Sequence, residues 1–187
     1  MEKQIRIKIY SFLSLDGYVL KTDSDYLLEY NHPEGEDYGF KRFLDSVECV
    51  VMNGIYYATQ QACDHWPAGN KPCHIITPSY FKVAPETHAD LILFHPENSS
   101  GFTDAIDSLR KKVKGDIWLA GDTDLISEFM EHGLIDEITL NVVPITIGNG
   151  NQLFNRNKHE RYWTLQHHTP YSNGVIQLKY TACQTIS

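Results

Sequence analysis

The chain of 187 residues is 42% hydrophobic and 21% charged, a composition typical of one soluble globular domain, which we expect to span residues 1–187. Its formal net charge of −8 at pH 7 argues against a protein that binds nucleic acid through phosphate contacts. No run approaches the roughly 20 consecutive apolar residues of a membrane span, so we expect no membrane partner either.

Strands and helices alternate along the first two thirds of the chain. Apolar residues alternate with other residues over 5–19, which predicts a strand that ends at the turn pair Asp16-Gly17. Helical spacing of apolar residues predicts helices that begin near Asp37, near Gly101 and after Gly121. Short apolar runs bounded by turn residues predict further strands over 47–52, 73–77, 89–94 and 116–120.

The C-terminal third consists mainly of predicted strands. One long strand is expected over 137–148, interrupted by Pro144. Asn173-Gly174 lies between two strand-like runs, which strongly indicates an antiparallel hairpin. The order of elements therefore predicts an α/β fold, in which a mixed, mostly parallel sheet is flanked by helices and finished by an antiparallel hairpin.

Glycine and polar residues follow four of the predicted strands. Ligands of such sheets bind outside the carboxyl ends of the strands, where glycines allow close approach and hydroxyl or N–H groups suit phosphate oxygens. Each turn taken alone is more often structural, but their common position favours a ligand site at this edge. The four turns are Asp16-Gly17, Asn53-Gly54, Thr77-Pro78-Ser79 and Gly121-Asp122-Thr123.

The turn at Gly121 has two interpretations. A strand, a glycine and a helix N-terminus in succession often bind a phosphate. Asp122, however, carries a negative charge where the phosphate would bind, and Asp122 or Thr123 is a good N-cap for the helix. The sequence leaves open whether this is a cofactor turn or only a capped helix start.

Two carboxylates are candidates for acid–base chemistry. Asp16 lies at a strand end and is the first choice, and Glu36, beside Asp37 at a helix start, is the second. A carboxylate at a helix start usually just interacts favourably with the helix dipole.

The cysteines indicate neither a disulfide framework nor a metal site. No Cys-x-x-Cys spacing is present, and four scattered cysteines favour reduced thiols in a cytoplasmic protein. No zinc pattern is matched by the possible set Cys63, His65, Cys73 and His74, so no metal is predicted.

Four segments together resemble one protein family. They are SFLSLDGYV (11–19), VECVVMNGIYY (47–57), HIITPS (74–79) and the run from GDIWLAGDTDL to GNGNQLF (115–154). The chain resembles the dihydrofolate-reductase-like superfamily, and more closely the bacterial riboflavin-biosynthesis reductase domain and its stand-alone relatives. The most specific part is GLIDEITLNVVPITIGNG. The resemblance implies a sheet of about eight strands, NADPH as hydride donor, a pterin- or pyrimidine-type substrate and a homodimer.

The resemblance also implies roles for the strand-end turns. Leu15, Asp16 and Gly17 would border the nicotinamide and the substrate. The turn at Asn53 and Gly54 would meet the adenosine side of the cofactor. The remaining implied contacts are Thr77 and Ser79 with the ribose 2′-phosphate, and Gly121, Asp122 and Thr123 with the pyrophosphate.

Two departures from the family pattern bear on cofactor binding. Family members usually read Met-Gly-Arg-x-Thr-Tyr where this chain has Met-Asn-Gly-Ile-Tyr-Tyr (52–57), and Gly-Gly where it has Gly121-Asp122. A phosphate-facing arginine and threonine are lost, and a carboxylate is gained. The leading hypothesis is an NADPH-dependent reductase. The alternative is a family member with weakened cofactor binding that serves as a ligand-binding or interaction protein.

Overall fold

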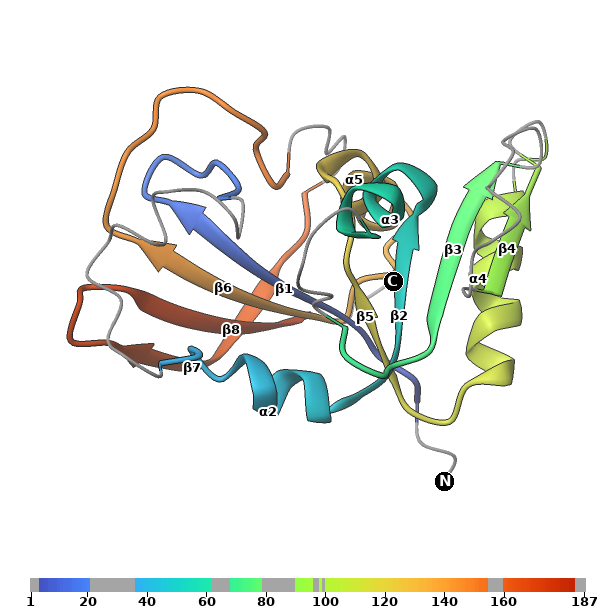
Figure 1. The fold of residues 1–187 in the computed structure, drawn as a ribbon, viewed down its shortest axis with the longest axis horizontal. Coiled ribbons are helices and arrows are strands. Elements are labelled where there is room, and N and C mark those ends of the chain that lie inside the picture. Colours follow the sequence, from blue (N-terminus) through green and yellow to red (C-terminus); the bar gives the residue numbers. More distant parts are fainter. Residues whose placement is uncertain are drawn as a thin grey trace.

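A single sheet of eight strands runs through the computed structural model (Figure 1). The structure describes residues 4–20, 36–61, 68–78, 90–95, 98, 100–154 and 160–183. The strands are β1 (Ile7–Ser14), β2 (Val47–Asn53), β3 (Cys73–Pro78), β4 (Asp90–Phe94), β5 (Asp116–Leu119), β6 (Glu137–Val143), β7 (Trp163–Pro170) and β8 (Ile176–Ala182). Their order across the sheet is β4-β3-β2-β5-β1-β6-β8-β7.

The pairing of the strands confirms the predicted α/β fold. Neighbouring strands from β4 to β6 in this order are parallel, whereas β8 is antiparallel to both β6 and β7. The predicted hairpin is formed by β7 and β8, and its turn contains Gly174 at a φ of 87°, a left-handed conformation that suits glycine. The result is a parallel sheet with one antiparallel edge.

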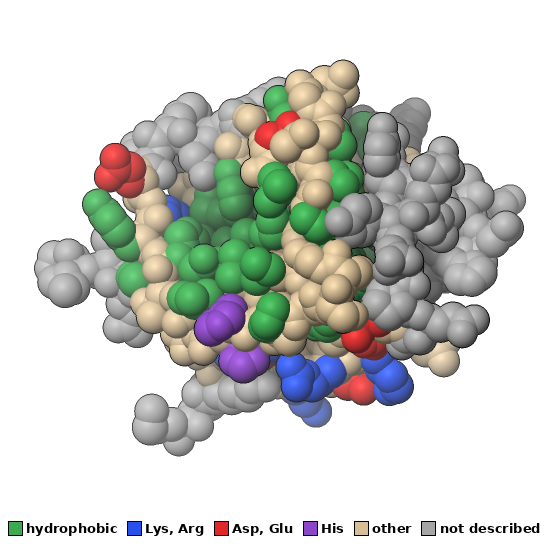
Figure 2. All heavy atoms as spheres, turned by 90° about the vertical axis from the view of Figure 1, so that its left-hand side faces the viewer, with side chains coloured by type: hydrophobic (Ala, Val, Ile, Leu, Met, Phe, Trp, Pro, Cys, Tyr) green, Lys and Arg blue, Asp and Glu red, His purple; other side chains and the backbone are tan. Residues whose placement is uncertain are grey.

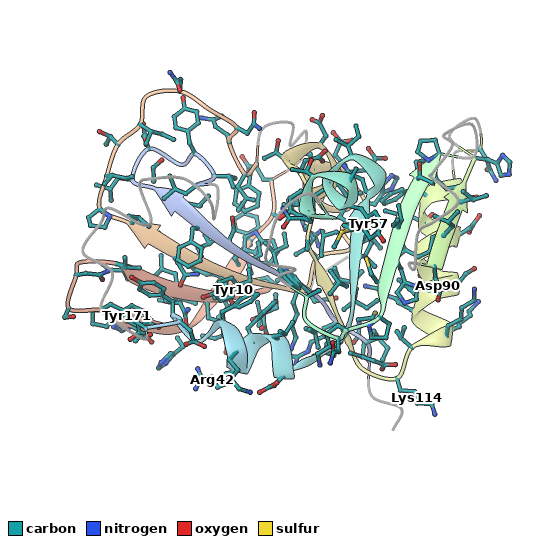
Figure 3. All side chains as sticks on the ribbon, viewed as in Figure 1. Tyr10, Arg42, Tyr57, Asp90, Lys114 and Tyr171 are labelled. Atoms are coloured by element: carbon teal, nitrogen blue, oxygen red, sulfur yellow. The ribbon has the colours of Figure 1, made fainter. Side chains whose placement is uncertain are left out.

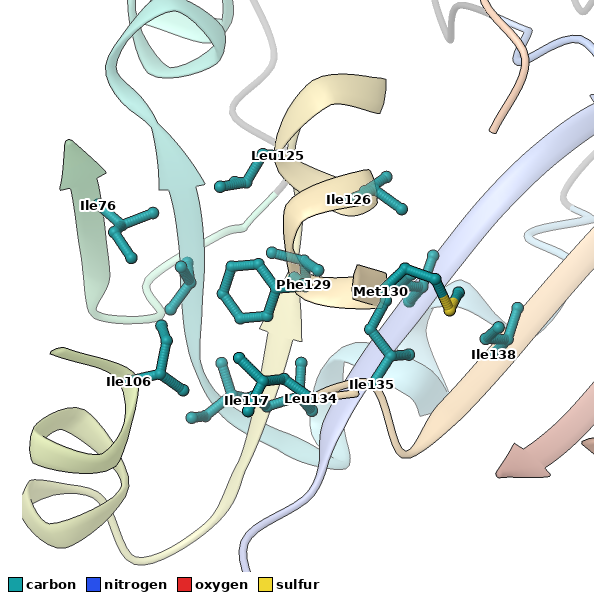
Figure 4. Packing of buried hydrophobic residues seen from close by; sticks show 14 of the residues in the cluster. Ile76, Ile106, Ile117, Leu125, Ile126, Phe129, Met130, Leu134, Ile135 and Ile138 are labelled. Carbon is teal, nitrogen blue, oxygen red and sulfur yellow. The ribbon is translucent and has the colours of Figure 1, made fainter. Parts of the chain in front are cut away.

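Helices cover both faces of the sheet. The described helices are α2 (Phe40–Asp45), α3 (Gly54–Gln61), α4 (Gly101–Lys112) and α5 (Thr123–Glu131). On one face, Ile106 of α4 and Phe129 of α5 pack against Ile117 of β5 (Figure 4). On the other face, Phe43 of α2 packs with Trp118. None of these helices is long and apolar enough to cross a membrane.

Two elements differ from the sequence-based prediction. Helix α3 follows β2 directly, although Asn53-Gly54 indicated only a turn. Strand β6 ends at Val143, so the predicted strand over 137–148 is too long. Pro144 has no N–H to donate to the sheet, and this explains why pairing stops there.

The amino edge of the sheet is held by charged residues. The side chain of Asp136 accepts a 2.8 Å hydrogen bond from the backbone N–H of Ile7. Glu137 is buried and contacts Lys179 at 3.0 Å and Arg6 at 3.3 Å. The acidic pair of the Leu-Ile-Asp-Glu motif therefore anchors β6 to its neighbours, at the edge opposite the candidate ligand site.

Candidate functional site

The turns that the sequence singled out lie along the carboxyl edge of the parallel strands. Because β2, β5 and β1 are neighbours in the sheet, the turns that follow them come close together. Figure 1 shows α3 and α5 beginning next to each other at the ends of β2 and β5. The carboxyl edge is therefore the candidate site.

A direct hydrogen bond joins the turns after β2 and β5. The Asn53 side chain donates from Nδ2 to Oδ2 of Asp122 at 2.6 Å. Each of the two residues also caps its own helix, because Asn53 Oδ1 accepts from Tyr56 N at 2.8 Å and Asp122 Oδ1 accepts from Leu125 N at 2.9 Å. The structure thus confirms Asp122 as the N-cap of α5.

Gly121 packs closely against the Leu125 side chain. A Cβ atom at this position would lie 2.7 Å from Cδ2 of Leu125 and 3.3 Å from its Cβ. Leu125 belongs to the first turn of α5 and is buried in the main core. The glycine therefore lets the start of α5 approach the end of β5, and this explains it without a ligand.

The Leu15-Asp16-Gly17 turn is fastened to the loop after β6. The Asp16 carboxylate accepts hydrogen bonds from the backbone N–H of Gly148 at 2.8 Å and of Ile147 at 3.2 Å. Gly17 has a φ of 84°, which the turn requires. The side chain of Leu15 is 61% exposed at the rim of the edge.

The hydrogen bonds at Asp16 bear on its role in catalysis. Bonds from the Ser14 side chain and from the N–H groups of Gly148 and Ile147 lower the pKa of Asp16 below its usual value. The carboxylate is therefore ionised at neutral pH, and both of its oxygens accept hydrogen bonds from backbone N–H groups. This geometry suits a residue that positions the turn better than one that donates a proton.

Glu36 lies in a different environment, shortly before α2. Its carboxylate accepts a 2.9 Å hydrogen bond from Tyr38 N, and the Tyr38 ring contacts Tyr171 with centroids 4.8 Å apart. Burial, and then the negative charges of Glu36 and Asp37, raise the pKa of Tyr171, which is labelled together with Tyr10 in Figure 3. The described contacts place Glu36 with these aromatic residues and do not join it to Asp16.

The remaining candidate residues offer few accessible donors. Thr77 is 2% exposed and Thr123 is 8% exposed, so both residues are buried. Gly54 is the first residue of α3. Ser79 lies outside the described residues.

The possible metal set is only partly described, because Cys63 and His65 lie outside the described residues. Among the residues that the structure describes, no three His, Cys, Asp or Glu side chains group as metal ligands. His74 Nδ1 lies 3.6 Å from a carboxylate oxygen of Asp90, and burial raises the pKa of the Cys73 thiol to about 12. The described contacts and burial of Cys73 and His74 are therefore those of structural residues.

The fold is that of the dihydrofolate-reductase-like superfamily. Dihydrofolate reductase from Enterococcus faecalis, solved in a complex with NADP(H), superimposes with a TM-score of 0.62 at 13% identity, over 97% of this chain and 98% of that one. A protein of Shewanella sp. PV-4 assigned to riboflavin biosynthesis superimposes with a TM-score of 0.80 at 22% identity, over 96% of this chain and all of that one.

The chain belongs to the RibD C-terminal domain family, whose model matches residues 59–177. It is also 31% identical to the protein YwjB of Bacillus subtilis (strain 168), over 92% of this chain and 95% of the relative. The family that the strand-end motifs indicated is therefore confirmed.

A cofactor such as NADPH would need partners for its phosphates at this edge. The described residues that follow β1, β2, β5 and β6 (15–20, 54–61, 120–131 and 144–154) include no Lys or Arg. Thr77 and Thr123 are buried, and the Asp122 carboxylate stands at the N-terminus of α5. The described residues therefore fit the phosphates of NADPH poorly.

Sequence reasoning found the two polar turns but not their contact. It also missed Ile55, an apolar side chain that is 64% exposed in the first turn of α3. Asn is a preferred N-cap residue, and at Asn53 this preference could have indicated the start of α3 even though Gly54 follows. No sequence signal pairs residues that lie 69 positions apart.

Proposed function

We propose that this protein is a reductase of a pterin- or pyrimidine-type substrate, similar to 5-amino-6-(5-phosphoribosylamino)uracil reductase, and that it uses NADPH with weakened affinity for the phosphates. Membership of the RibD C-terminal domain family carries the proposal. The names of two structural neighbours, which refer to riboflavin biosynthesis and to NADP(H), support it.

The turn after β1 has properties that suit a planar heterocycle. Leu15 offers an exposed apolar side chain, and Gly17 leaves the backbone open because no atom of the described residues lies within 4 Å of the position of its missing Cβ. The Asp16 carboxylate holds this turn against the loop after β6, so the turn is rigid when a ring packs on it. When bound, the nicotinamide would supply the hydride. Asp16 remains ionised, so we assign the proton to water.

Titration of the purified protein with NADPH tests this proposal. Energy transfer from the three tryptophans to the nicotinamide reports binding. Saturation at micromolar to submillimolar NADPH, followed by NADPH oxidation with a pyrimidine or pterin substrate, is the expected result. No change at millimolar NADPH would exclude the reductase function.

A second candidate function is favoured by one observation, the hydrogen bond between Asn53 and Asp122. It places a carboxylate where a phosphate would bind, which is consistent with a family member that binds a ligand or partner without the cofactor. Such a protein would bind the heterocycle in the absence of NADPH and would not turn it over. A substrate titration without cofactor separates the two candidates.

We propose in addition that a second copy of the chain covers one face of the hairpin. The register of β6, β8 and β7 places apolar residues in cross-strand rows, with Val142 opposite Ile176, Leu140 opposite Leu178, and Tyr180 opposite Leu165. Figure 2 shows hydrophobic side chains gathered on the side of the molecule that carries the ends of these strands. Strand β7 is an edge with no charged residue, and such edges are usually protected. A two-fold dimer is the commonest way to bury such a face.

A further inference from the structure

Two helix N-termini meet at the centre of the carboxyl edge. Helix α3 begins directly after Asn53 and helix α5 directly after Asp122. Each N-terminus carries a partial positive charge from its free N–H groups, and together they form a place that attracts an anion. In the described part of the chain, the anion at this place is the Asp122 carboxylate.

Each side-chain oxygen and nitrogen of the two capping residues makes a hydrogen bond, either to the other residue or to its helix. Asp122 uses Oδ1 for Leu125 N at 2.9 Å and Oδ2 for Asn53 Nδ2 at 2.6 Å. Asn53 uses its remaining atom, Oδ1, for Tyr56 N at 2.8 Å. An incoming phosphate would have to take over these N–H groups while lying next to a carboxylate.

The described segments at this edge supply no cation to offset that charge. Residues 15–20, 54–61, 120–131 and 144–154 include Asp16 and Asp122 but neither Lys nor Arg. Among these residues, the repulsion between the carboxylate and a diphosphate is therefore opposed by the helix dipoles, which Asp122 already uses.

We infer that Asp122, held by Asn53, determines the ligand specificity of this edge by disfavouring diphosphate groups. This inference rests on the proposed function in placing the cofactor at this edge, and it explains a weakened affinity for NADPH by one side chain. Leu15 and Ile55 each expose an apolar, uncharged side chain after β1 and β2, and a neutral heterocycle that packs on them does not meet this repulsion.

The variant Asp122→Asn tests the inference, because Asn is an equally good N-cap and removes the charge, together with the acceptor for Asn53 Nδ2. The control is Asp45→Asn, which removes the same charge from an exposed pair on α2, Lys41 with Asp45 at 3.0 Å. Both variants and the native protein are titrated with NADPH and, separately, with inorganic pyrophosphate. A second variant, Asp122→Ser, keeps a capping oxygen and serves if Asn disturbs the fold.

The expected result is an affinity for both probes about ten- to a hundredfold higher in Asp122→Asn, the range of one charge-assisted contact, with no change in Asp45→Asn. Equal affinity of a folded Asp122 variant and the native protein for both probes would overturn the inference. If pyrophosphate binding improves while no variant oxidises NADPH with substrate, the inference holds and the reductase function fails. If NADPH supports turnover with equal affinity in all proteins, the function holds and the inference fails.

Discussion

Asp116→Asn should destabilise the fold strongly, because Asp116 neutralises a buried lysine. The Lys8 Nζ lies 2.8 Å from Asp116 Oδ2, and the two side chains are only 3% and 1% exposed. Among the described contacts, the Lys8 ammonium would then keep its 3.2 Å hydrogen bond to the Ser46 hydroxyl. Breaking a buried pair by removing one partner costs about 3–5 kcal/mol, a large share of the roughly 5–15 kcal/mol that stabilises a domain.

Arg6 contributes less than Lys8 to this loss of stability. It also contacts Asp116, at 2.8 Å, but its side chain is 43% exposed and can turn to water when the carboxylate is lost. The cost of the variant therefore comes mainly from Lys8.

Urea unfolding of the native protein and of Asp116→Asn at pH 7 measures the free energy of unfolding. Asp45→Asn is the control, because its partner Lys41 is 80% exposed and the pair should contribute about 0.5 kcal/mol or less. The double variant Lys8→Met/Asp116→Asn should recover part of the loss, since it removes the unpaired charge. A loss below about 1 kcal/mol in Asp116→Asn would refute the reasoning.

The pH dependence of the effect follows from the sign of the pKa shift. Burial raises the pKa of Asp116, but hydrogen bonds from Lys8 and Arg6 outweigh burial and lower it below its usual value. A carboxylate with a lowered folded pKa stabilises the protein above its unfolded pKa, and this contribution is lost as the pH falls through the folded pKa. The difference between the native protein and Asp116→Asn should therefore be the same at pH 7 and pH 5.

Three further predictions concern separate parts of the molecule. Asn53→Ala and Asp122→Ala should each destabilise the protein by about 1–2 kcal/mol through loss of a cap, and the double variant by less than their sum, whereas additive unfolding energies would contradict the contact between them. In sedimentation velocity, Leu165→Glu should convert the dimer into a monomer. The control Leu91→Glu, at a side chain that is 46% exposed on the opposite edge strand, should leave the dimer intact. A native protein that sediments as a monomer would exclude the dimer. Burial lowers the pKa of His74 despite the nearby Asp90, so protonation of His74 favours unfolding. The free energy of unfolding should therefore fall as the pH drops through about 6.5. In urea unfolding, His74→Gln should reduce this dependence on pH.

The fold was largely predictable because its signals are local. Alternation between short apolar runs and amphipathic segments predicted a parallel sheet with helices, and Asn173-Gly174 predicted the terminal hairpin. Helix α3 was missed because its first residues, Gly54 and Ile55, are poor helix formers, and the helix depends on the Asn53 cap and on packing of Tyr57 in the core. Tertiary contacts decide such a segment.

The candidate site was predictable in position and not in chemistry. Parallel strands place their carboxyl ends at one edge whatever the side chains, so the turns at Asp16, Asn53 and Asp122 were expected to come together. The role of each side chain there depends on partners far away in the chain, such as Gly148 for Asp16, which is 132 residues distant. An Asp in a sequence can serve in a turn, as an N-cap or in catalysis, and only its bonding partner in the structure distinguishes these roles.

The two departures from the family pattern are best understood as one change. Asn53 alone would direct an amide N–H across the edge with no acceptor, and Asp122 alone would bring a carboxylate oxygen there with no donor. Together they form a 2.6 Å hydrogen bond and leave each residue free to cap its own helix. An unsatisfied polar group at a partly buried position costs about 1–3 kcal/mol, so each residue makes the other acceptable. The arrangement stabilises the starts of α3 and α5 without a bound anion, and the same carboxylate that provides this stability opposes a diphosphate at the edge.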